Sequence, residues 1–228
     1  MEKMQNTYCI YKNMKDTKSF LFDFDGVILN SMEAHALSWQ RAYRAIGIEL
    51  SLFDIYIREG MSGRDSIIDI AKEKKIPVPT DDEMSIIHTQ KIIYFNEYHT
   101  EVYPEIYEIF SFLKKLEKTI CIVTGSLRAS LIERLPKELT AFVDAAVCSD
   151  DLPRGKPAPD PYLKGLALLN ASADTSMVIE NAPMGIRSAK AAGLFCAAIE
   201  TSLDRNYLTQ SDIVFKNHKE LYEYIINQ

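Results

Sequence analysis

From residue 104 to its C-terminus, the chain alternates short β-rich apolar runs with stretches whose apolar residues recur at helical spacing. Pro104 suits the first turn of a helix, and residues 119–123 have the composition of a buried strand. Such alternation is typical of sheets whose strands are mostly parallel. The sequence therefore predicts an α/β fold with a doubly wound, mostly parallel sheet. Further strands are expected at residues 145–148, 177–179, 195–199 and 212–215.

Residues 32–102 interrupt this alternation with a block of helical patterns that contains no convincing strand. Apolar side chains follow one stripe in residues 32–46, and residues 80–83 (Thr-Asp-Asp-Glu) form a capping box that predicts the start of a long helix. Shorter helices are expected at residues 52–58 and 64–73. We therefore predict an all-helical cap domain inserted after the first strand. The predicted organisation is a tail of residues 1–17, a core of residues 18–31 and 103–228, and a cap of residues 32–102.

The composition is ordinary for a globular chain of 228 residues, and the net charge of −6 disfavours a nucleic acid or an anionic membrane as partner. No signal peptide and no apolar run of membrane length is visible, so we expect a cytoplasmic protein, with a monomer as the default state. Met14 is an alternative start within a polar, patternless N-terminal segment. Three of the four cysteines lie in apolar contexts typical of buried thiols. The cysteines are Cys9, Cys121, Cys148 and Cys196.

Two carboxylates lie two residues apart at the end of the first predicted strand. Asp23 and Asp25 follow the apolar run of residues 20–22. The carboxyl ends of parallel strands form the ligand-binding edge of an open α/β sheet. Negative charge buried there needs a positive partner, and a hard cation suits carboxylate oxygens. The Asp25-Gly26 pair is also a hairpin signal, so this motif alone leaves a plain β-turn open.

Three later segments, each at or just after a predicted strand end, change that balance. They are Thr124-Gly125-Ser126, Gly155-Lys156-Pro157-Ala158-Pro159-Asp160 and Glu180-Asn181-Ala182-Pro183-Met184-Gly185. Hydroxyl and backbone N–H groups before a helix suit an anion. Together with residues 23–27, the segments in this order resemble the haloacid dehalogenase superfamily of phosphotransferases. The helical insertion is similar to that of its β-phosphoglucomutase-like branch, and the likeness covers nearly the whole chain beyond residue 18.

The resemblance implies a role for each of these segments. Asp23 would be the nucleophile that forms an aspartyl-phosphate, and Asp25 would be the general acid and then the general base. Lys156 would balance the charge of the nucleophile and the phosphate, and Thr124 would also be catalytic. The implied phosphate-binding residues are Thr124, Gly125, Ser126 and Lys156. The implied Mg²⁺ ligands are Asp23, Asp25 (through its backbone carbonyl), Glu180 and Asn181.

Asn181 departs from the pattern of many relatives, which carry a second acid at this position. An amide oxygen can ligate a metal or position one of its waters, but the site has lost one negative charge. Either Mg²⁺ is held less tightly, or Glu59, in a glycine-rich cap loop, compensates when substrate binds. A cap carboxylate combined with the Glu-Asn-Ala-Pro motif resembles a subgroup that includes a bacterial inorganic pyrophosphatase. A solvated position for Glu59 is the alternative.

His35 and Arg64 suggest a second activity. The β-phosphoglucomutases carry a histidine at the spacing that separates His35 from Asp23, beside the proton path of the acid that matches Asp25. Arg64 suits a second phosphate, although a helix-end residue that faces water is an equal reading.

We therefore predict a Mg²⁺-dependent phosphohydrolase that acts on a small phosphate compound, such as a sugar phosphate, phosphoglycolate or pyrophosphate. A phosphosugar mutase is the main alternative. A phosphate-binding protein without activity is disfavoured because the acidic residues and the lysine of the four segments are intact. Trp39 is interpreted as a core residue, and His88 is too isolated for a role to be assigned.

Overall fold

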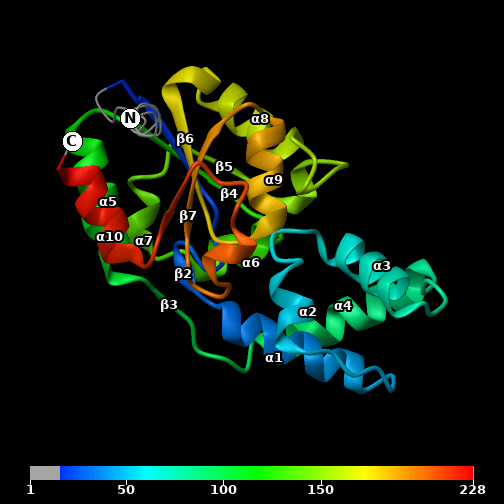
Figure 1. The fold of residues 1–228 in the computed structure, drawn as a ribbon. Coiled ribbons are helices and arrows are strands. Elements are labelled where there is room, and N and C mark those ends of the chain that lie inside the picture. The colour runs from blue at the N-terminus through cyan, green and yellow to red at the C-terminus, as the bar shows by residue number, and fades with distance from the viewer. Residues whose placement is uncertain (1–15, 228) are drawn as a thin grey trace, which may run out of the picture.

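The computed structural model describes residues 16–227, which form a parallel sheet with a helical cap beside it (Figure 1). The sheet has six strands in the order β5-β4-β1-β6-β7-β8, and every neighbouring pair is parallel. The predicted α/β fold with a doubly wound, mostly parallel sheet is confirmed. The strands are β1 (Ser19–Phe22), β4 (Thr119–Val123), β5 (Ala145–Val147), β6 (Ser176–Glu180), β7 (Phe195–Ile199) and β8 (Ile213–Phe215).

Helices cover both faces of this sheet and enclose two apolar cores. Because side chains alternate across a strand, Phe20 and Phe22 of β1 enter one core and Leu21 enters the other. All three side chains are fully buried, which explains the unbroken apolar run before Asp23. The first core is covered by α5 (Pro104–Lys115) and α10 (His218–Ile226), and the second by α8 (Asp160–Leu168) and α9 (Pro183–Ala191).

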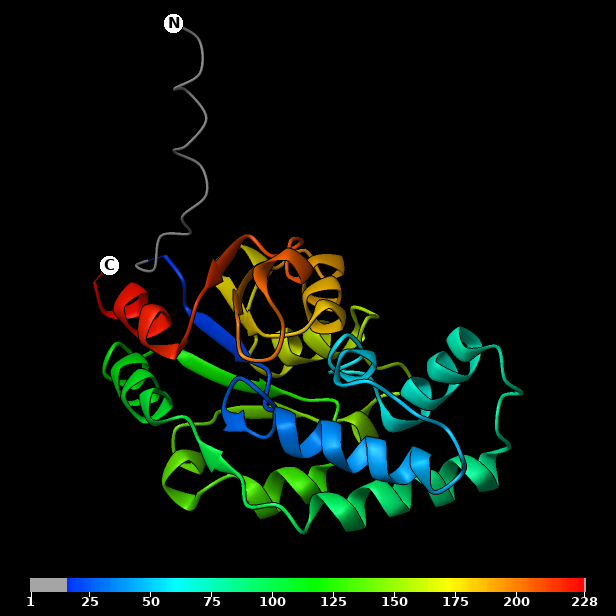
Figure 2. The same ribbon diagram turned by 60° about the horizontal axis from the view of Figure 1, so that its bottom comes forward.

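The cap lies beyond the carboxyl ends of the strands and has a core of its own (Figure 2). Trp39, Tyr43 and Ile87 are among the buried side chains of that core. The predicted capping box is present, because Thr80 and Glu83 exchange hydrogen bonds at the start of the fourth cap helix. The cap helices are α1 (Met32–Arg44), α2 (Leu52–Tyr56), α3 (Gly63–Lys74) and α4 (Asp81–Phe95).

A short antiparallel ribbon joins the two passages of the chain between core and cap. β2 (Leu29–Asn30) pairs with β3 (Glu101–Val102). The expectation that residues 32–102 lack a strand is therefore wrong at their C-terminal end, where a two-residue pairing is too short to leave a sequence pattern. Asp25-Gly26 does lead into a turn at residues 26–28, but the turn forms no hairpin with β1, which pairs with β4 and β6 among the described residues.

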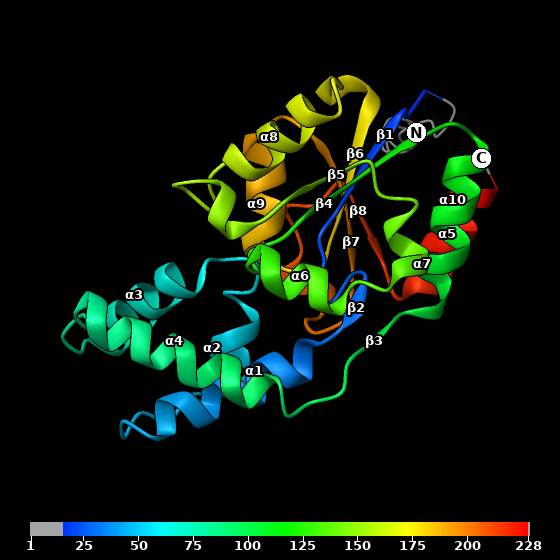
Figure 3. The ribbon, with the colours of Figure 1, turned by 180° about the vertical axis from the view of Figure 1, so that it is seen from behind.

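The loops after β4 and β7 carry further short helices. Figure 3 shows α6 (Arg128–Arg134) between the sheet and the cap, and α7 (Lys137–Thr140) follows it. A 3₁₀ turn at Arg205–Tyr207 follows β7. Three cysteines are free and buried as expected, whereas Cys9, Met14 and most of the predicted tail lie outside the described residues. Among residues 16–227, no helix has the length and apolar character needed to cross a membrane.

Candidate active site

The predicted site residues meet at the carboxyl edge of three adjacent strands. Asp23 directly follows β1, Thr124 directly follows β4, and Glu180 is the last residue of β6. Because the strand order is β4-β1-β6, Asp23 lies between the other two. β4 and β5 lie on one side of β1, and the later strands β6, β7 and β8 lie on the other side. Open α/β sheets bind ligands at such a point, where the order of the strands reverses.

Lys156 connects two of the buried carboxylates. Its Nζ donates hydrogen bonds to Oδ1 of Asp23 at 2.8 Å and to Oε1 of Glu180 at 2.6 Å. A third hydrogen bond, 3.0 Å long, goes to the backbone carbonyl of Val123. All three donors of the ammonium group are therefore used, and both carboxylates have a positive partner, as burial of charge requires.

The pKa values at this centre reflect burial and close charges. Burial opposes the ammonium form of Lys156, but Asp23 and Glu180 outweigh it and raise the pKa of the lysine above its usual range. Burial, with the charge of Glu180, raises the pKa of Asp23 well above its usual value, although Lys156 acts in the opposite direction. The lysine therefore stays charged, and the nucleophile candidate is a destabilised carboxylate.

Glu180 is held in place by its own neighbours. Tyr162, from α8, donates its hydroxyl hydrogen to Oε1 at 2.6 Å, and the backbone N–H of Asn181 donates to Oε2 at 3.0 Å. Gly185, in the first turns of α9, leaves room for this carboxylate, because a Cβ at that position would lie 1.7 Å from Oε1. Tyr162 is a site residue that the sequence did not reveal, since a tyrosine among apolar helix residues is typical of a core.

Asp25 is surrounded by hydrogen-bond donors. Ser31 donates to its Oδ1 at 2.7 Å, Ser126 donates to its Oδ2 at 2.8 Å, and Nε2 of His35 lies 3.0 Å from Oδ1. Burial alone would raise the pKa of Asp25, but His35 and these hydrogen bonds outweigh burial and lower the pKa below its usual range. The hydroxyl of Ser126 is therefore directed to the candidate acid, and the role of Ser126 at the phosphate stays a prediction.

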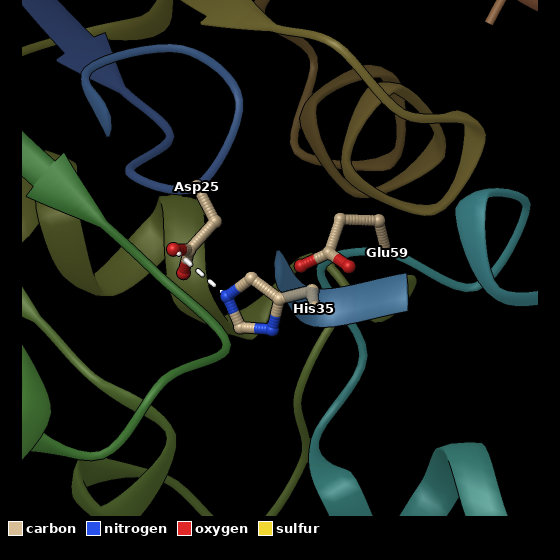
Figure 4. Close-up of side chains that lie close together, drawn as sticks. All are labelled: Asp25, His35 and Glu59. Atoms are coloured by element: carbon tan, nitrogen blue, oxygen red, sulfur yellow. Dashed lines mark ion pairs between the residues drawn. The ribbon is translucent and has the colours of Figure 1, made fainter. Parts of the chain in front are cut away.

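His35 lies between Asp25 and a buried cap lysine. Nζ of Lys91, from α4, is 2.8 Å from Nδ1 of His35. Because a charged lysine can only donate, Nδ1 accepts and Nε2 carries the proton that faces Asp25 (Figure 4). The structure thus places His35 beside the candidate acid, and it adds Lys91, which sequence reasoning missed.

Glu59 faces the same residues from the cap loop (Figure 4). Its side chain is half-buried, and one carboxylate oxygen lies within 4.8 Å of ligand atoms of Asp25 and His35. Burial raises the pKa of Glu59; the nearby Asp25 acts in the same direction and His35 in the opposite one. These three residues form an acidic group that could hold a metal ion. The proton on Nε2 leaves only the two carboxylates of this group as ligands for a hard cation.

The predicted Mg²⁺ ligands offer suitable oxygens. Oδ1 of Asn181 is buried and has no hydrogen-bond partner among the described residues. Buried polar atoms without partners are rare, and an oxygen-preferring cation would satisfy this one. The residues present therefore fit Mg²⁺. Glu180 is turned to Lys156 and Tyr162, so its role as a ligand stays a prediction.

The cap loop lies directly against the phosphate-binding segment expected at residues 124–126. A Cβ added to Gly125 would lie 2.6 Å from the backbone oxygen of Gly60, so only glycine fits at this close approach. On the other side of the cap, the rings of Phe53 in α2 and Tyr207 in the core lie 5.0 Å apart. The described arrangement is therefore one in which the cap covers the site.

Not every predicted residue is brought to the site. Arg64 pairs with Asp81 in the cap, and its side chain is 60 % exposed, so it faces water rather than Asp23. Trp39 belongs to the cap core as expected, yet it also lines the cavity that Asp25 borders, as does His88. The contact of Gly63 with the ring of His88 depends on the packing of α3 on α4, which no local pattern reveals.

Comparison with known proteins agrees with this architecture. The sequence model of the haloacid dehalogenase-like hydrolases matches residues 20–199, so the chain belongs to this family. Validoxylamine A 7'-phosphate phosphatase from Streptomyces hygroscopicus subsp. limoneus is 27 % identical over 207 residues, covering 90 % of this chain and 95 % of that protein. Hexitol phosphatase A from Escherichia coli (strain K12) is 29 % identical over 214 residues, which cover 90 % of this chain and 93 % of that protein.

A solved structure is similar over a comparable length. A putative β-phosphoglucomutase from Bacteroides vulgatus superimposes with a TM-score of 0.82 at 30 % identity, covering 91 % of this chain and 87 % of that one. The expected likeness to the β-phosphoglucomutase-like branch is confirmed. The protein is thus a hydrolase of the phosphatase type whose relatives are named for phosphorylated sugars and related metabolites.

Proposed function

We propose that this protein is a Mg²⁺-dependent phosphatase that hydrolyses a small phosphorylated metabolite through an aspartyl-phosphate on Asp23. The observation that carries this proposal is the environment of the Asp23 carboxylate. Its Oδ1 accepts a hydrogen bond from Lys156, whereas its buried Oδ2 has no partner among the described residues. A carboxylate oxygen that no donor occupies is available to attack phosphorus.

The reaction then proceeds in two halves. Oδ2 of Asp23 attacks phosphorus, the bond from phosphorus to the leaving oxygen breaks, and Asp25 donates a proton to that oxygen. In the second half Asp25 accepts a proton from water, the water oxygen attacks phosphorus, and the bond to Asp23 breaks. Lys156 remains beside Asp23 throughout and offsets the negative charge, while the Thr124 hydroxyl and the backbone N–H of Gly125 bind the other phosphoryl oxygens.

The hydrogen bonds to Asp25 suit both halves of this sequence. The carboxylate form that they stabilise is the one needed to accept a proton from water. The first half needs the protonated form of Asp25, which the second half regenerates, and the Nε2 proton of His35 faces the Asp25 carboxyl group and orients it. Lys91 fixes the His35 tautomer that presents this proton, so Lys91 acts as a positioning residue.

Mg²⁺, when bound, would withdraw negative charge from the phosphoryl oxygens. Its ligands would be Asp23, the backbone carbonyl of Asp25, Glu180 and Asn181. Asn181 contributes no charge, so the site is one carboxylate short of the pattern in many relatives. Glu59, which faces Asp25 from the cap, supports the reading that a cap carboxylate compensates for this loss.

Access to Asp23 requires the cap to move. Asp23 is buried and does not line the cavity that Asp25 borders, and Gly125 is in close contact with the cap loop. Opening would admit the phosphate, and closing would exclude bulk water during the first half of the reaction. The ribbon of β2 and β3 is the short connection about which such movement would occur.

Two alternative activities have specific support. A phosphosugar mutase of the β-phosphoglucomutase type is favoured by His35 beside Asp25, and pyrophosphate hydrolysis by Glu59 at the same place. Arg64, which faces water, lends no support to a second phosphate site. A phosphate-binding protein without activity would not need the free oxygen of Asp23.

The test is kcat/KM with Mg²⁺ for pyrophosphate, phosphoglycolate, hexose 6-phosphates and β-glucose 1-phosphate. Phosphate release and isomer formation are followed together, with Asp23→Asn as the blank. Phosphate release that depends on Asp23 supports the phosphatase. Isomer formation without net phosphate release would replace it with the mutase, and no turnover of any compound would remove the enzymatic proposal.

A further inference from the structure

A cavity between cap and core continues from Asp25 into the cap. It is lined by residues of α1, α4 and α6, with Asp25 at its border. In the proposed reaction Asp25 protonates the leaving oxygen, so the rest of the leaving group occupies this cavity. The inference below rests on that proposed function. The volume of about 70 Å³ in the described arrangement leaves room for a small leaving group.

Lys91 is a buried cation on the cap side of this cavity. Its exposure is 7 %, and Nζ lies 4.6 Å from the centre of the Phe95 ring and 5.6 Å from that of Trp39. Its hydrogen-bond partner is a neutral nitrogen of His35, and no carboxylate of the described residues lies within ion-pair distance of Nζ. Burial lowers the pKa of Lys91 to about 8, which reflects this incomplete compensation.

Arg134, from α6, is a second cation on the core side. Its guanidinium carbon lies 4.3 Å from the centre of the same Phe95 ring. Two of its nitrogens donate to Asn96 and Thr100, which are uncharged, and its Nε is buried without a hydrogen-bond partner among the described residues. Arg134 also acts to lower the pKa of Lys91, so the two like charges are close enough to repel each other.

Two of the three lysine and arginine side chains that line the cavity form no ion pair among the described residues. Arg58, the third cation of its lining, is already paired with Asp69 and Glu73. The two remaining cations face only two carboxylates of the lining, Asp25 and Glu59.

We propose that Arg134 and Lys91 form an anion-binding subsite for the leaving group, so that preferred substrates carry a second oxyanion beyond the transferred phosphoryl group. A carboxylate or a second phosphate in the cavity would accept a hydrogen bond from the free Nε of Arg134. Its negative charge would also offset the repulsion between Arg134 and Lys91. The substrate class is therefore small phosphorylated carboxylic acids or pyrophosphate, rather than phosphorylated neutral alcohols.

The test compares substrates of matched shape. D-3-phosphoglycerate and glycerol 1-phosphate share a carbon skeleton and differ by a carboxylate in place of a hydroxymethyl group, and pyrophosphate represents the phosphate source of the oxyanion. We expect kcat/KM to be about 10- to 100-fold higher for at least one anionic substrate than for glycerol 1-phosphate, as one charge-assisted hydrogen bond supplies. A preference for D-3-phosphoglycerate identifies the second oxyanion as a carboxylate, and a preference for pyrophosphate identifies it as a phosphate.

Variants of Arg134 separate the subsite from a purely structural role. Arg134→Gln is expected to reduce the ratio of kcat/KM for the preferred anionic substrate to kcat/KM for glycerol 1-phosphate at least about tenfold. Arg134→Lys is expected to restore part of this ratio. Arg44→Gln, which removes an exposed cap arginine paired with Glu49, is the matched control and is expected to leave the ratio unchanged. Loss of the contacts to Asn96 and Thr100 alone would lower kcat/KM for all three substrates equally.

Two results would overturn the subsite. One is a wild-type enzyme that hydrolyses glycerol 1-phosphate at least as well as both anionic substrates; the other is a preference that Arg134→Gln leaves intact. In both cases hydrolysis still occurs, so the proposed function stands. Absence of any Asp23-dependent hydrolysis would instead remove the proposed function and the subsite with it.

Discussion

Nζ of Lys156 lies 2.8 Å from Oδ1 of Asp23, although 133 residues separate the two in the sequence. Both side chains are almost completely buried, and the same ammonium group also contacts Glu180. This contact sets the charge state of the centre and leaves Oδ2 as the reactive oxygen of Asp23.

Lys156→Met is expected to reduce kcat/KM for p-nitrophenyl phosphate by at least about 1,000-fold, because the phosphoryl transfer loses its nearest protein cation. Removal also leaves two buried carboxylates without a positive partner, which should destabilise the fold by roughly 3–5 kcal/mol in urea unfolding. Lys114→Met is the control. It removes a partly exposed pair with Asp144, worth about 0–1 kcal/mol. Activity within about tenfold of wild type would contradict the assigned role.

Lys91 gives the protein a pH-dependent stability. The titratable groups that face it are His35 from α1, His88 from α4, Asp25 and Glu59 from loops, and Arg134 from α6. Its pKa is about 8 in the folded protein and about 10.4 in an unfolded chain. Between these values the unfolded chain binds more protons, so the free energy of unfolding should rise with pH.

The rise is measured by urea unfolding at pH 7.5, 9 and 10. Wild type should gain roughly 2 kcal/mol relative to Lys91→Met over this range, since the variant has no proton to lose at the site. Other lysines and tyrosines titrate in both proteins and cancel in the difference. Parallel curves for the two proteins would show that burial does not perturb Lys91.

Glu59→Gln tests whether a cap carboxylate compensates for Asn181. We expect the Mg²⁺ concentration for half-maximal activity to rise several-fold and the preference among pyrophosphate and phosphate esters to change, because one nearby negative charge is lost. Glu97→Gln removes an exposed cap carboxylate paired with Arg41 and serves as control. If Glu59→Gln altered neither Mg²⁺ activation nor substrate preference, Glu59 would be only a surface residue of the loop.

Gly185→Ala tests the packing beneath Glu180. The added methyl group would lie 1.7 Å from Oε1, so the carboxylate or α9 must shift. We expect a loss of roughly 2–4 kcal/mol of stability together with reduced activity, because Glu180 orients Lys156. Gly47→Ala is the comparison, since Gly47 has φ +77° but open space around it and should cost only about 1 kcal/mol. Equal effects of the two substitutions would show that Glu180 has room to move.

The sequence predicted the parts of this site that have fixed places in the chain. Asp23, Lys156 and Glu180 each lie at a strand end or in a stiff loop, and parallel strands bring such positions together. The doubly wound fold was predictable for the same reason, because strand and helix alternate from residue 104 onward.

Residues supplied by packed helices were not predictable. Tyr162 reaches Glu180 from α8, and Lys91 reaches His35 from α4, yet each sits in an ordinary helical pattern. Their roles depend on which helix face meets the site, and that is set by tertiary packing. The opposite error occurs at Arg64: its place beside the glycine-rich loop suggested a role in the site, but its side chain pairs with Asp81 and faces water.

The central claim is that Asp23 forms a covalent bond to phosphorus. The most direct measurement is acid quenching of wild-type enzyme and Asp23→Asn during turnover, with mass spectrometry of the peptide that contains residue 23. The account predicts a phosphate-sized mass increase on Asp23 in the wild type, and neither modification nor turnover in the variant. Activity of Asp23→Asn above about a thousandth of wild type, with no modified peptide in either protein, would contradict the covalent mechanism.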